Sequence, residues 1–477
     1  MTTIIKPTKY THRFLARLVI EAKTPLAIGS GEKDIISDAL VATDVNGLPY
    51  IPGTAIAGVV RSLLKQEEVD TDTFFGFQSK NQGEGSQIIF TEAKILNSKG
   101  EVVDGLNLEA IKTDPLLKNY AELPIRQHAK ISDKGTTVGG GKFDEQVVFA
   151  GTRFCFEMEM VSDGTNERAF EQVLEHLQSQ VFRIGSGTRR GFGEIEVKEL
   201  RTAELNLKNN LQSYLDKSSN LQESSTWTGW KESTSDNNLQ NGDWIKYKLT
   251  LCPEDFFLFG SGFGDDEADM TPMKAQKVVW EKGIGTLKDN LVLIPATSVK
   301  GALAHRVAYY YNKLKEVFAD KLSKGDYEQH VGKNNAAVKA LFGSEGERVD
   351  GKMKNQLRGN LIFSDIIEKP LHDKILNHVS IDRFTGGAID GALFSEKATY
   401  GKDTEFTTEI LLHEKAVKRL IEKENSDFKE VQQAFESALK DICTGMLPLG
   451  GGVNRGNGCF TGILKRNNET IYPKEEQ

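Results

Sequence analysis

The chain has 477 residues, of which 38% are hydrophobic, and it carries a formal net charge of −8. This length predicts two large domains rather than one core. No apolar run is long enough for a bilayer span or a signal core, so we expect a cytoplasmic protein without a membrane partner. The four cysteines lie far apart, which argues against a structural zinc site. The acidic balance is weak evidence against a polyanionic partner, because a binding groove needs only a local excess of cations.

One loop motif, GSG-x-x-D-x-x-x-D, occurs twice, from Gly29 to Asp38 and from Gly260 to Asp269. Each copy follows a predicted strand, residues 13–21 in the first and 244–251 in the second. The second strand alternates apolar and polar side chains, as a half-buried strand does. An internal repeat of this kind predicts two copies of one structural unit.

A strand-to-helix junction follows in each copy. Residues 48–54 lead into a predicted helix at 54–64, and residues 293–298 lead into one at 299–307. A Pro precedes each helix, and we expect a Thr or Ser to cap its first turn.

Further landmarks recur in the same order in both halves. They are a Phe-Gly turn, a short strand with an acidic end, a long excursion, a second strand and a glycine-rich turn. Their positions are 75–76, 88–92, 126–151, 153–160 and 185–193 in the first half, and 342–343, 361–365, 380–401, 405–412 and 450–458 in the second. This order predicts the α+β class, with two tandem ferredoxin-like domains. We expect domains at 1–201 and 244–477, joined by a polar linker at 202–243.

The run from Asp38 to Gly53, the Ser380–Gly386 stretch and the two glycine-rich turns resemble the RAMP superfamily. Within it, they are similar to the backbone subunits of type III CRISPR effector complexes. The resemblance covers nearly the whole chain and implies two RRM-like RAMP domains with inserted thumb hairpins and helical insertions. It implies subunits that stack along a guide RNA, splay it with the thumbs and cleave complementary target RNA beside each thumb. The thumbs are expected in 126–151 and 380–401, and the fusion of two domains suggests a type III-D-like system.

The resemblance makes Asp38 the cleavage aspartate of the first domain, and the repeat makes Asp269 its counterpart. RNA carries its own nucleophile, the 2′-OH, so alignment by the thumb and one carboxylate suffice for cleavage. The carboxylate acts as general base or holds Mg²⁺, which makes Asp38 and Asp269 the expected metal ligands. The competing interpretation is a loop aspartate that accepts backbone hydrogen bonds, and we expect Asp34 and Asp265 to be such loop residues or to lie next to the metal.

Cations near the repeated landmarks are the expected RNA-binding residues. They are Arg61, Arg126, His128, Lys130, Lys142, Arg189, Arg190, Lys300, Arg306, Arg383 and Arg455. Phosphate contact is expected of them, although a charge run is often a solvated face. The glycine-rich turns lack the Lys-Ser/Thr end of a nucleotide-binding loop.

The predicted function is therefore a guide-directed, metal-dependent endoribonuclease subunit. Its expected partners are a guide CRISPR RNA, complementary target RNA and other CRISPR effector subunits. The alternative is a scaffold subunit that binds guide RNA without cutting. A guide-processing ribonuclease with a His general base is a third possibility and the weakest, since no His recurs at matched positions of the repeat.

Overall fold

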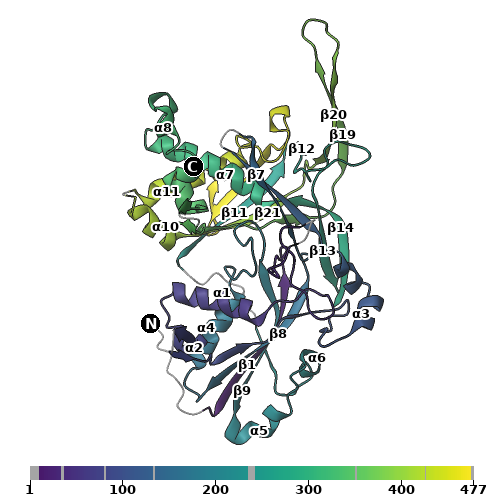
Figure 1. Cartoon of the computed structure of the whole chain (residues 1–477), viewed down its shortest axis with the longest axis vertical. Coiled ribbons are helices and arrows are strands. Elements are labelled where there is room, and N and C mark those ends of the chain that lie inside the picture. Colours follow the sequence, from purple (N-terminus) through teal and green to yellow (C-terminus); the bar gives the residue numbers. More distant parts are fainter. Residues whose placement is uncertain are drawn as a thin grey trace.

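The computed structural model describes residues 10–33, 37–79, 82–132, 135–234, 242–349, 352–424 and 426–473. Each half contains an open antiparallel sheet, and the first sheet lies below the second in Figure 1. The first sheet has the order β4 (Ile88–Phe90), β8 (Arg153–Ser162), β1 (His12–Ala22), β9 (Ile195–Asn206), and the second has the order β17 (Leu361–Ile362), β21 (Phe406–His413), β11 (Trp244–Pro253), β22 (Phe460–Arg466). In both, the first core strand lies between the third and the fourth, as in a ferredoxin-like sheet. The predicted fold class is confirmed.

Helices cover one face of the first sheet, where Ile56, Val60 and Val173 are fully buried. The remaining elements of this half are α1 (Gly53–Gln66), α2 (Asp72–Phe75), β2 (Phe77–Ser79), β3 (Gln82–Glu84), β5 (Lys94–Ile95), α3 (Leu108–Thr113), η1 (Leu117–Ala121), β6 (Ile125–Ile131), β7 (Thr137–Gln146), α4 (Glu167–Gln178), α5 (Leu207–Leu215), α6 (Leu221–Ser224) and β10 (Lys231–Ser233).

The second half repeats this layering, with Tyr247 and Leu249 of β11 buried under the helices as their alternation predicts. Its remaining elements are β12 (Phe256–Phe257), β13 (Lys274–Glu281), β14 (Ile284–Ile294), α7 (Ala296–Leu314), η2 (Ala319–Lys321), α8 (Lys324–Tyr327), η3 (Gly332–Asn334), α9 (Ala336–Phe342), β15 (Glu347–Val349), β16 (Lys352–Lys354), β18 (Ile366–Glu368), β19 (Asp373–Ile381), β20 (Ala388–Tyr400), α10 (Glu414–Glu422), α11 (Phe428–Cys443), η4 (Val453–Arg455) and β23 (Glu469–Tyr472).

The helices α1 and α7 begin directly after Pro52 and Pro295, and neither of these N-cap residues forms a side-chain cap. The expected capping by Thr or Ser is wrong, because those residues already lie inside the first turn. In α7, the backbone N–H of Ala296 donates instead to Oδ1 of Asp365 at 2.8 Å. The cap is thus supplied by a residue distant in the sequence.

The segment expected to be a linker, 202–243, contains α5, α6 and β10 in its described part. β10 extends the first sheet beside β9. Ser224 of α6 donates to the buried carboxylate of Glu157, which also pairs with Arg17 at 2.8 Å. Much of the segment therefore packs on the first half, and the domain boundaries stay a prediction.

Two long hairpins, β6–β7 and β19–β20, lie at the positions expected for the thumbs, and the second extends beyond the rest of the molecule (Figure 1). The register pairs His128 with Phe143 in the first hairpin and His378 with Phe394 in the second. The second hairpin begins at Asp373, so the expected excursion at 380–401 is too short at its N-terminal end. The sequence motif used to place it forms the hairpin tip rather than its base.

The extra length of the second half before Ile294 forms the hairpin β13–β14, which packs on the first half. Val278 belongs to the first core, and Nε1 of Trp280 donates to the carbonyl of Gly151 at 2.8 Å. A Cβ at Gly151 would lie 1.9 Å from the carbonyl oxygen of Val278, so this approach requires glycine. The insertion fastens the two halves together.

A second contact between the halves converges on the buried side chain of Asp365. Its Oδ2 accepts a hydrogen bond from Nη2 of Arg126 in β6 at 2.5 Å, and its Oδ1 accepts the backbone N–H of Ala296 at the start of α7. Its backbone N–H donates to the carbonyl of Gly191 at 3.3 Å. Burial raises the pKa of the Asp365 carboxyl, and the charge of Arg126 opposes that rise. Asp365 therefore joins the first hairpin and the first glycine-rich turn to the second domain.

We expect Arg126→Met and Asp365→Asn each to lower the free energy of unfolding by about 3 kcal/mol, because each leaves the other group buried without its partner. The double variant should recover most of this loss, since the introduced amide carbonyl still accepts from Ala296 and no buried charge remains. Urea unfolding of the three variants checks this. Additive losses in the double variant would contradict the assigned pairing.

Candidate functional site

The two predicted cleavage aspartates occupy equivalent places at the bases of the two hairpins. Oδ2 of Asp38 accepts the backbone N–H of Asp144 in β7 at 3.1 Å. Oδ2 of Asp269 accepts the backbone N–H of Ser395 in β20 at 2.7 Å and its hydroxyl at 3.0 Å. These hydrogen bonds lower the pKa of Asp269. Both aspartates are exposed to solvent.

The backbone around the aspartates matches as well. The residue after each aspartate forms a parallel bridge with a hairpin glutamate, Ala39 with Glu145 and Met270 with Glu396. The repeat in the sequence therefore corresponds to a repeat in three dimensions. Within the described residues, no hydrogen bond engages the other carboxylate oxygen of either aspartate.

Asp265, the other aspartate of the second loop motif, behaves differently. Asp265 accepts the backbone N–H groups of Glu267 and Ala268 and pairs with Lys397 at 2.7 Å. Its carboxylate accepts backbone hydrogen bonds of its own loop, as expected of a loop aspartate, and the ion pair with Lys397 ties that loop to β20. Asp34 lies outside the described residues.

Beside Asp38, four side chains form a compact cluster that we call the first latch: His128, Phe143, Glu145 and Arg190. The rings of His128 and Phe143 stack with centroids 4.7 Å apart, and the guanidinium of Arg190 lies 5.0 Å from the centroid of the Phe143 ring. Nε2 of His128 and Nη2 of Arg190 lie 2.8 Å and 2.9 Å from Oε1 of Glu145. The cluster binds the hairpin base to the glycine-rich turn.

The second domain carries the same cluster, the second latch: His378, Phe394, Glu396 and Arg455. The His378 and Phe394 rings stack at 4.9 Å, and Arg455 lies 5.3 Å from the Phe394 centroid. Nε2 of His378 lies 3.2 Å from Oε1 of Glu396, and Arg455 pairs with Oε2 of the same carboxylate. Asn457 adds a hydrogen bond at 2.9 Å.

The latches correct the statement that no His recurs at matched positions. His128 and His378 are equivalent in register, and both are paired with a glutamate. The signal in the sequence was Phe-x-Glu, at 143–145 and 394–396, preceded by a His on the partner strand. The sequence alone does not reveal it, because Arg126 and Ser380, the first residues of the two predicted excursions, are not equivalent in hairpin register.

Both latch glutamates are held as carboxylates. Burial by itself would raise the pKa of Glu145, but the contact with His128 and the charge of Arg190 outweigh it and lower that pKa. Burial by itself would also raise the pKa of Glu396. The hydrogen bonds from Arg455 and Asn457 outweigh burial and lower that pKa. Each latch is thus a buried anion shared by two potential cations.

A cluster of cations lies where the first glycine-rich turn meets α7, and we call it the seam cluster: Arg183, Arg189, Lys300 and Arg358. Burial, with the charges of Arg190 and Arg189, lowers the pKa of Lys300 to about 8. Burial and the charges of Arg358 and Arg183 lower the pKa of Arg189, whose Nε donates to the carbonyl of Gly359. Arg183 pairs with Glu194 at 3.3 Å, whereas no ion pair of Arg189, Lys300 or Arg358 occurs within the described residues. These three cations are therefore short of negative charge, as a phosphate-binding surface is.

The cations of the first hairpin contact the second domain. Arg126 is buried against Asp365, which gives it a structural role. Lys130 pairs with Glu345 at 2.8 Å, and Lys142 lies 5.2 Å from the centroid of the Phe263 ring. Arg189, Arg190 and Lys300 therefore lie in one region. The cations of the first hairpin lie apart from them, against the second domain.

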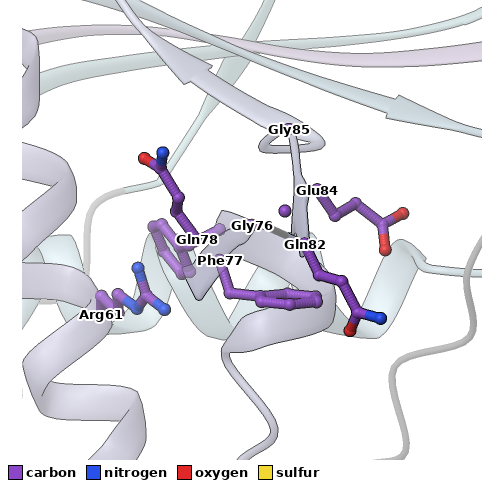
Figure 2. A pocket seen from close by; sticks show the side chains of 9 residues that line it. Arg61, Gly76, Phe77, Gln78, Gln82, Glu84 and Gly85 are labelled. Atoms are coloured by element: carbon purple, nitrogen blue, oxygen red, sulfur yellow. The ribbon is translucent and has the colours of Figure 1, made fainter. Parts of the chain in front are cut away.

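Two further predicted residues lie elsewhere. Arg306 pairs with Asp441 of α11 at 2.5 Å. Arg61 pairs with Asp72 at 2.5 Å and lines an open pocket of about 600 Å³ beside the β2–β3 hairpin (Figure 2). The residues that line this pocket include none from the latches or the seam cluster.

Arg383 is exposed at the tip of the second hairpin. There Oδ1 of Asp382 accepts the backbone N–H groups of Phe384 and Thr385, which lowers the pKa of Asp382 and fixes the turn. Phe384 is 99% exposed. The tip thus presents a cation and an aromatic ring to solvent.

The aspartate sites offer the oxygen ligands that Mg²⁺ prefers. In the first, Oδ1 of Asp144 is shielded from solvent and accepts no hydrogen bond within the described residues. In the second, Ser395 takes that position and supplies a hydroxyl. Because Mg²⁺ keeps several waters and needs only one or two carboxylates, the residues present fit it.

Within the described ranges, no helix combines the length and apolar composition needed to cross a bilayer.

Comparison with known proteins agrees with the geometry. A protein of Methanocaldococcus jannaschii named "CRISPR system Cms endoribonuclease Csm3" is 26% identical over 203 residues, which is 38% of this chain and 77% of the relative. The family model of the RAMP superfamily matches residues 19–196 and 276–461, one match in each half. The chain belongs to the RAMP superfamily, as two tandem domains of that family.

Proposed function

We propose that this chain is a backbone subunit of a type III CRISPR ribonucleoprotein that binds guide RNA and cleaves complementary target RNA at two positions. The observation that carries the proposal is the equivalence of Asp38 and Asp269, each exposed and each anchored to the base of its own hairpin. The name of the archaeal relative, a CRISPR endoribonuclease, supports the same activity.

The proposed reaction uses the 2′-OH of the target RNA as nucleophile. The hairpin unstacks one nucleotide so that its 2′-OH lines up with the adjacent phosphorus. Asp38 or Asp269 accepts the proton from that hydroxyl, the 2′-oxygen bonds to phosphorus, and the bond from phosphorus to the 5′-oxygen breaks. The departing 5′-oxygen takes up a proton from water. The products carry a 2′,3′-cyclic phosphate and a 5′-OH. Bound Mg²⁺ would neutralise charge that develops on the phosphate.

Guide binding is assigned to the seam cluster. Phosphates supply the negative charge that Arg189 and Lys300 lack in the described chain. The sequence of the target would then be selected by base pairing with the guide, while the protein holds the backbone.

The second hairpin is the proposed contact with a neighbouring subunit and with RNA. The first hairpin packs on the second domain through Arg126 and Lys130, whereas the second hairpin projects freely from this chain (Figure 1). In register, Leu393 of the second hairpin replaces Lys142 and is 70% exposed. The partner surface for this hairpin should therefore be more apolar than the surface that receives the first.

A non-cleaving scaffold is the second candidate. It is favoured by the backbone hydrogen bonds to Asp38 and Asp269, since aspartates in purely structural loops make such bonds.

Asp38→Asn and Asp269→Asn separate the two candidates, because each keeps its loop hydrogen bond and removes the charge. In the assembled complex with guide, Mg²⁺ and end-labelled target RNA, each variant should slow a different cut by about 100-fold or more. Asp265→Asn, an aspartate in the same loop as Asp269, should leave both cuts intact, and EDTA should abolish both. If both active-site variants cut like the wild type, the chain is a scaffold.

Lys300→Gln should weaken guide RNA binding and stabilise the free protein. The folded pKa of Lys300 is about 8, below that of an unfolded lysine, so folding opposes its charge and stability rises with pH between about 8 and 10.5. Removing the charge should add about 1 kcal/mol to the free energy of unfolding at pH 7. It should also make the plot of log RNA affinity against log salt concentration less steep, by about the slope that one phosphate contact contributes.

Thermal unfolding and RNA titrations at several salt concentrations measure both effects. In the wild type, RNA affinity should fall as the pH rises through about 8, and in Lys300→Gln this dependence should disappear. The matched control is Lys313→Gln, an exposed lysine on the same helix. A variant that loses stability and keeps its RNA affinity would exclude phosphate contact at Lys300.

A further inference from the structure

The two latches are the most elaborate repeated feature of the chain outside the aspartates. Each combines a stacked His–Phe pair, a buried glutamate and an arginine from the glycine-rich turn. Their geometry agrees to within a few tenths of an ångström in the ring stacking, at 4.7 and 4.9 Å. The same arrangement thus forms in two domains whose hairpins otherwise differ in partner and sequence.

Stability alone does not account for this arrangement. Glu145 is 4% exposed and Glu396 is fully buried, so each carboxylate has lost its hydration. Desolvation of a buried ion pair commonly offsets its Coulombic attraction, and an apolar contact would hold the hairpin base equally well. What a buried, hydrogen-bonded charge network supplies is a defined geometry.

That geometry is transmitted directly to the aspartates. The hairpin residue that donates its N–H to Asp38 is Asp144, and the next residue is Glu145. In the second domain, Ser395 donates to Asp269 and is followed by Glu396. The parallel bridges from Ala39 and Met270 pair the aspartate loops with the glutamates themselves. A displacement of either glutamate therefore displaces the aspartate of its own domain.

We propose that Glu145 and Glu396 are positioning residues for RNA cleavage, each of which fixes the aspartate of its own domain through the hairpin strand. The inference rests on the proposed function, because it concerns the rate at that site. Arg190 and Arg455 hold the glutamates from the glycine-rich turn, while the Phe and His rings fix the direction of the arginines. The latch thus couples three elements at each cleavage site: the aspartate loop, the hairpin and the glycine-rich turn.

The test uses Glu145→Gln and Glu396→Gln in the assembled complex with guide RNA and Mg²⁺. The rate of each cut is measured with the complex in excess over labelled target RNA, alongside target affinity. Glu145→Gln should slow the Asp38 cut about tenfold or more, since small misplacements of a reacting group have such effects. The rate of the Asp269 cut and the target affinity should stay within about twofold of the wild-type values. Glu396→Gln should slow the Asp269 cut and leave the Asp38 cut unchanged.

Glu157→Gln is a control matched for burial and pairing. Glu157 is 6% exposed and pairs with Arg17 and Lys217, but its partners lie on the sheet and the α5–α6 segment, away from the hairpin base. This variant should lower the melting temperature as the latch variants do and leave both cuts unchanged. Arg190→Lys, which keeps the charge and loses the planar fork, probes the first latch by a milder change and should slow the same cut as Glu145→Gln.

The outcomes separate the inference from the function on which it rests. If the wild type makes two cuts and Asp38→Asn removes one, the proposed function holds. The inference is then overturned if Glu145→Gln slows both cuts equally, slows neither, or matches Glu157→Gln. The double variant Asp38→Asn/Glu145→Gln should make the first-domain cut no more slowly than Asp38→Asn alone. That result would further support the inference, since the effects of residues that act as a unit are not additive.

Discussion

The buried contact between Arg126 and Asp365 is the interaction on which the arrangement of the two domains depends. It ties the base of the first hairpin to the start of α7, and the Asp365 backbone reaches the first glycine-rich turn. A Cβ at Gly191 would lie 2.4 Å from Oδ1 of Asp365, so the turn approaches this carboxylate as closely as glycine permits. Because Arg189 lies in the same turn and Lys300 lies on the same helix, this contact also sets the positions of these two cations.

The two domains of the chain place their hairpins in different surroundings. The first domain gives its hairpin to the second domain, whereas the second domain leaves its hairpin exposed, with an apolar side chain at Leu393 and an aromatic one at Phe384. The counterpart of Asp365 in the first domain is Glu92, whose side chain is 53% exposed. The two ends of the fused pair are therefore chemically different.

The sequence predicted the order of elements, the fold class and the equivalence of Asp38 with Asp269, because these depend on periodicity and on a local motif with fixed spacing. It did not predict the latches, since their members come from three segments that only hairpin register brings together. It also missed the cap of α7, which Asp365 supplies from a distant strand. For the same reason Arg126, expected to contact RNA, proved to be neutralised by a partner that no local pattern reveals.

The central claim is that two independent sites in one chain use the nucleophile of the RNA itself. It is tested most directly with target RNAs that carry a single 2′-deoxy nucleotide immediately 5′ of one cut or the other, given to the wild-type complex. The account predicts that each substitution abolishes the adjacent cut and leaves the other at its normal rate. Loss of both cuts together, or cleavage that continues at the deoxy position, would contradict it.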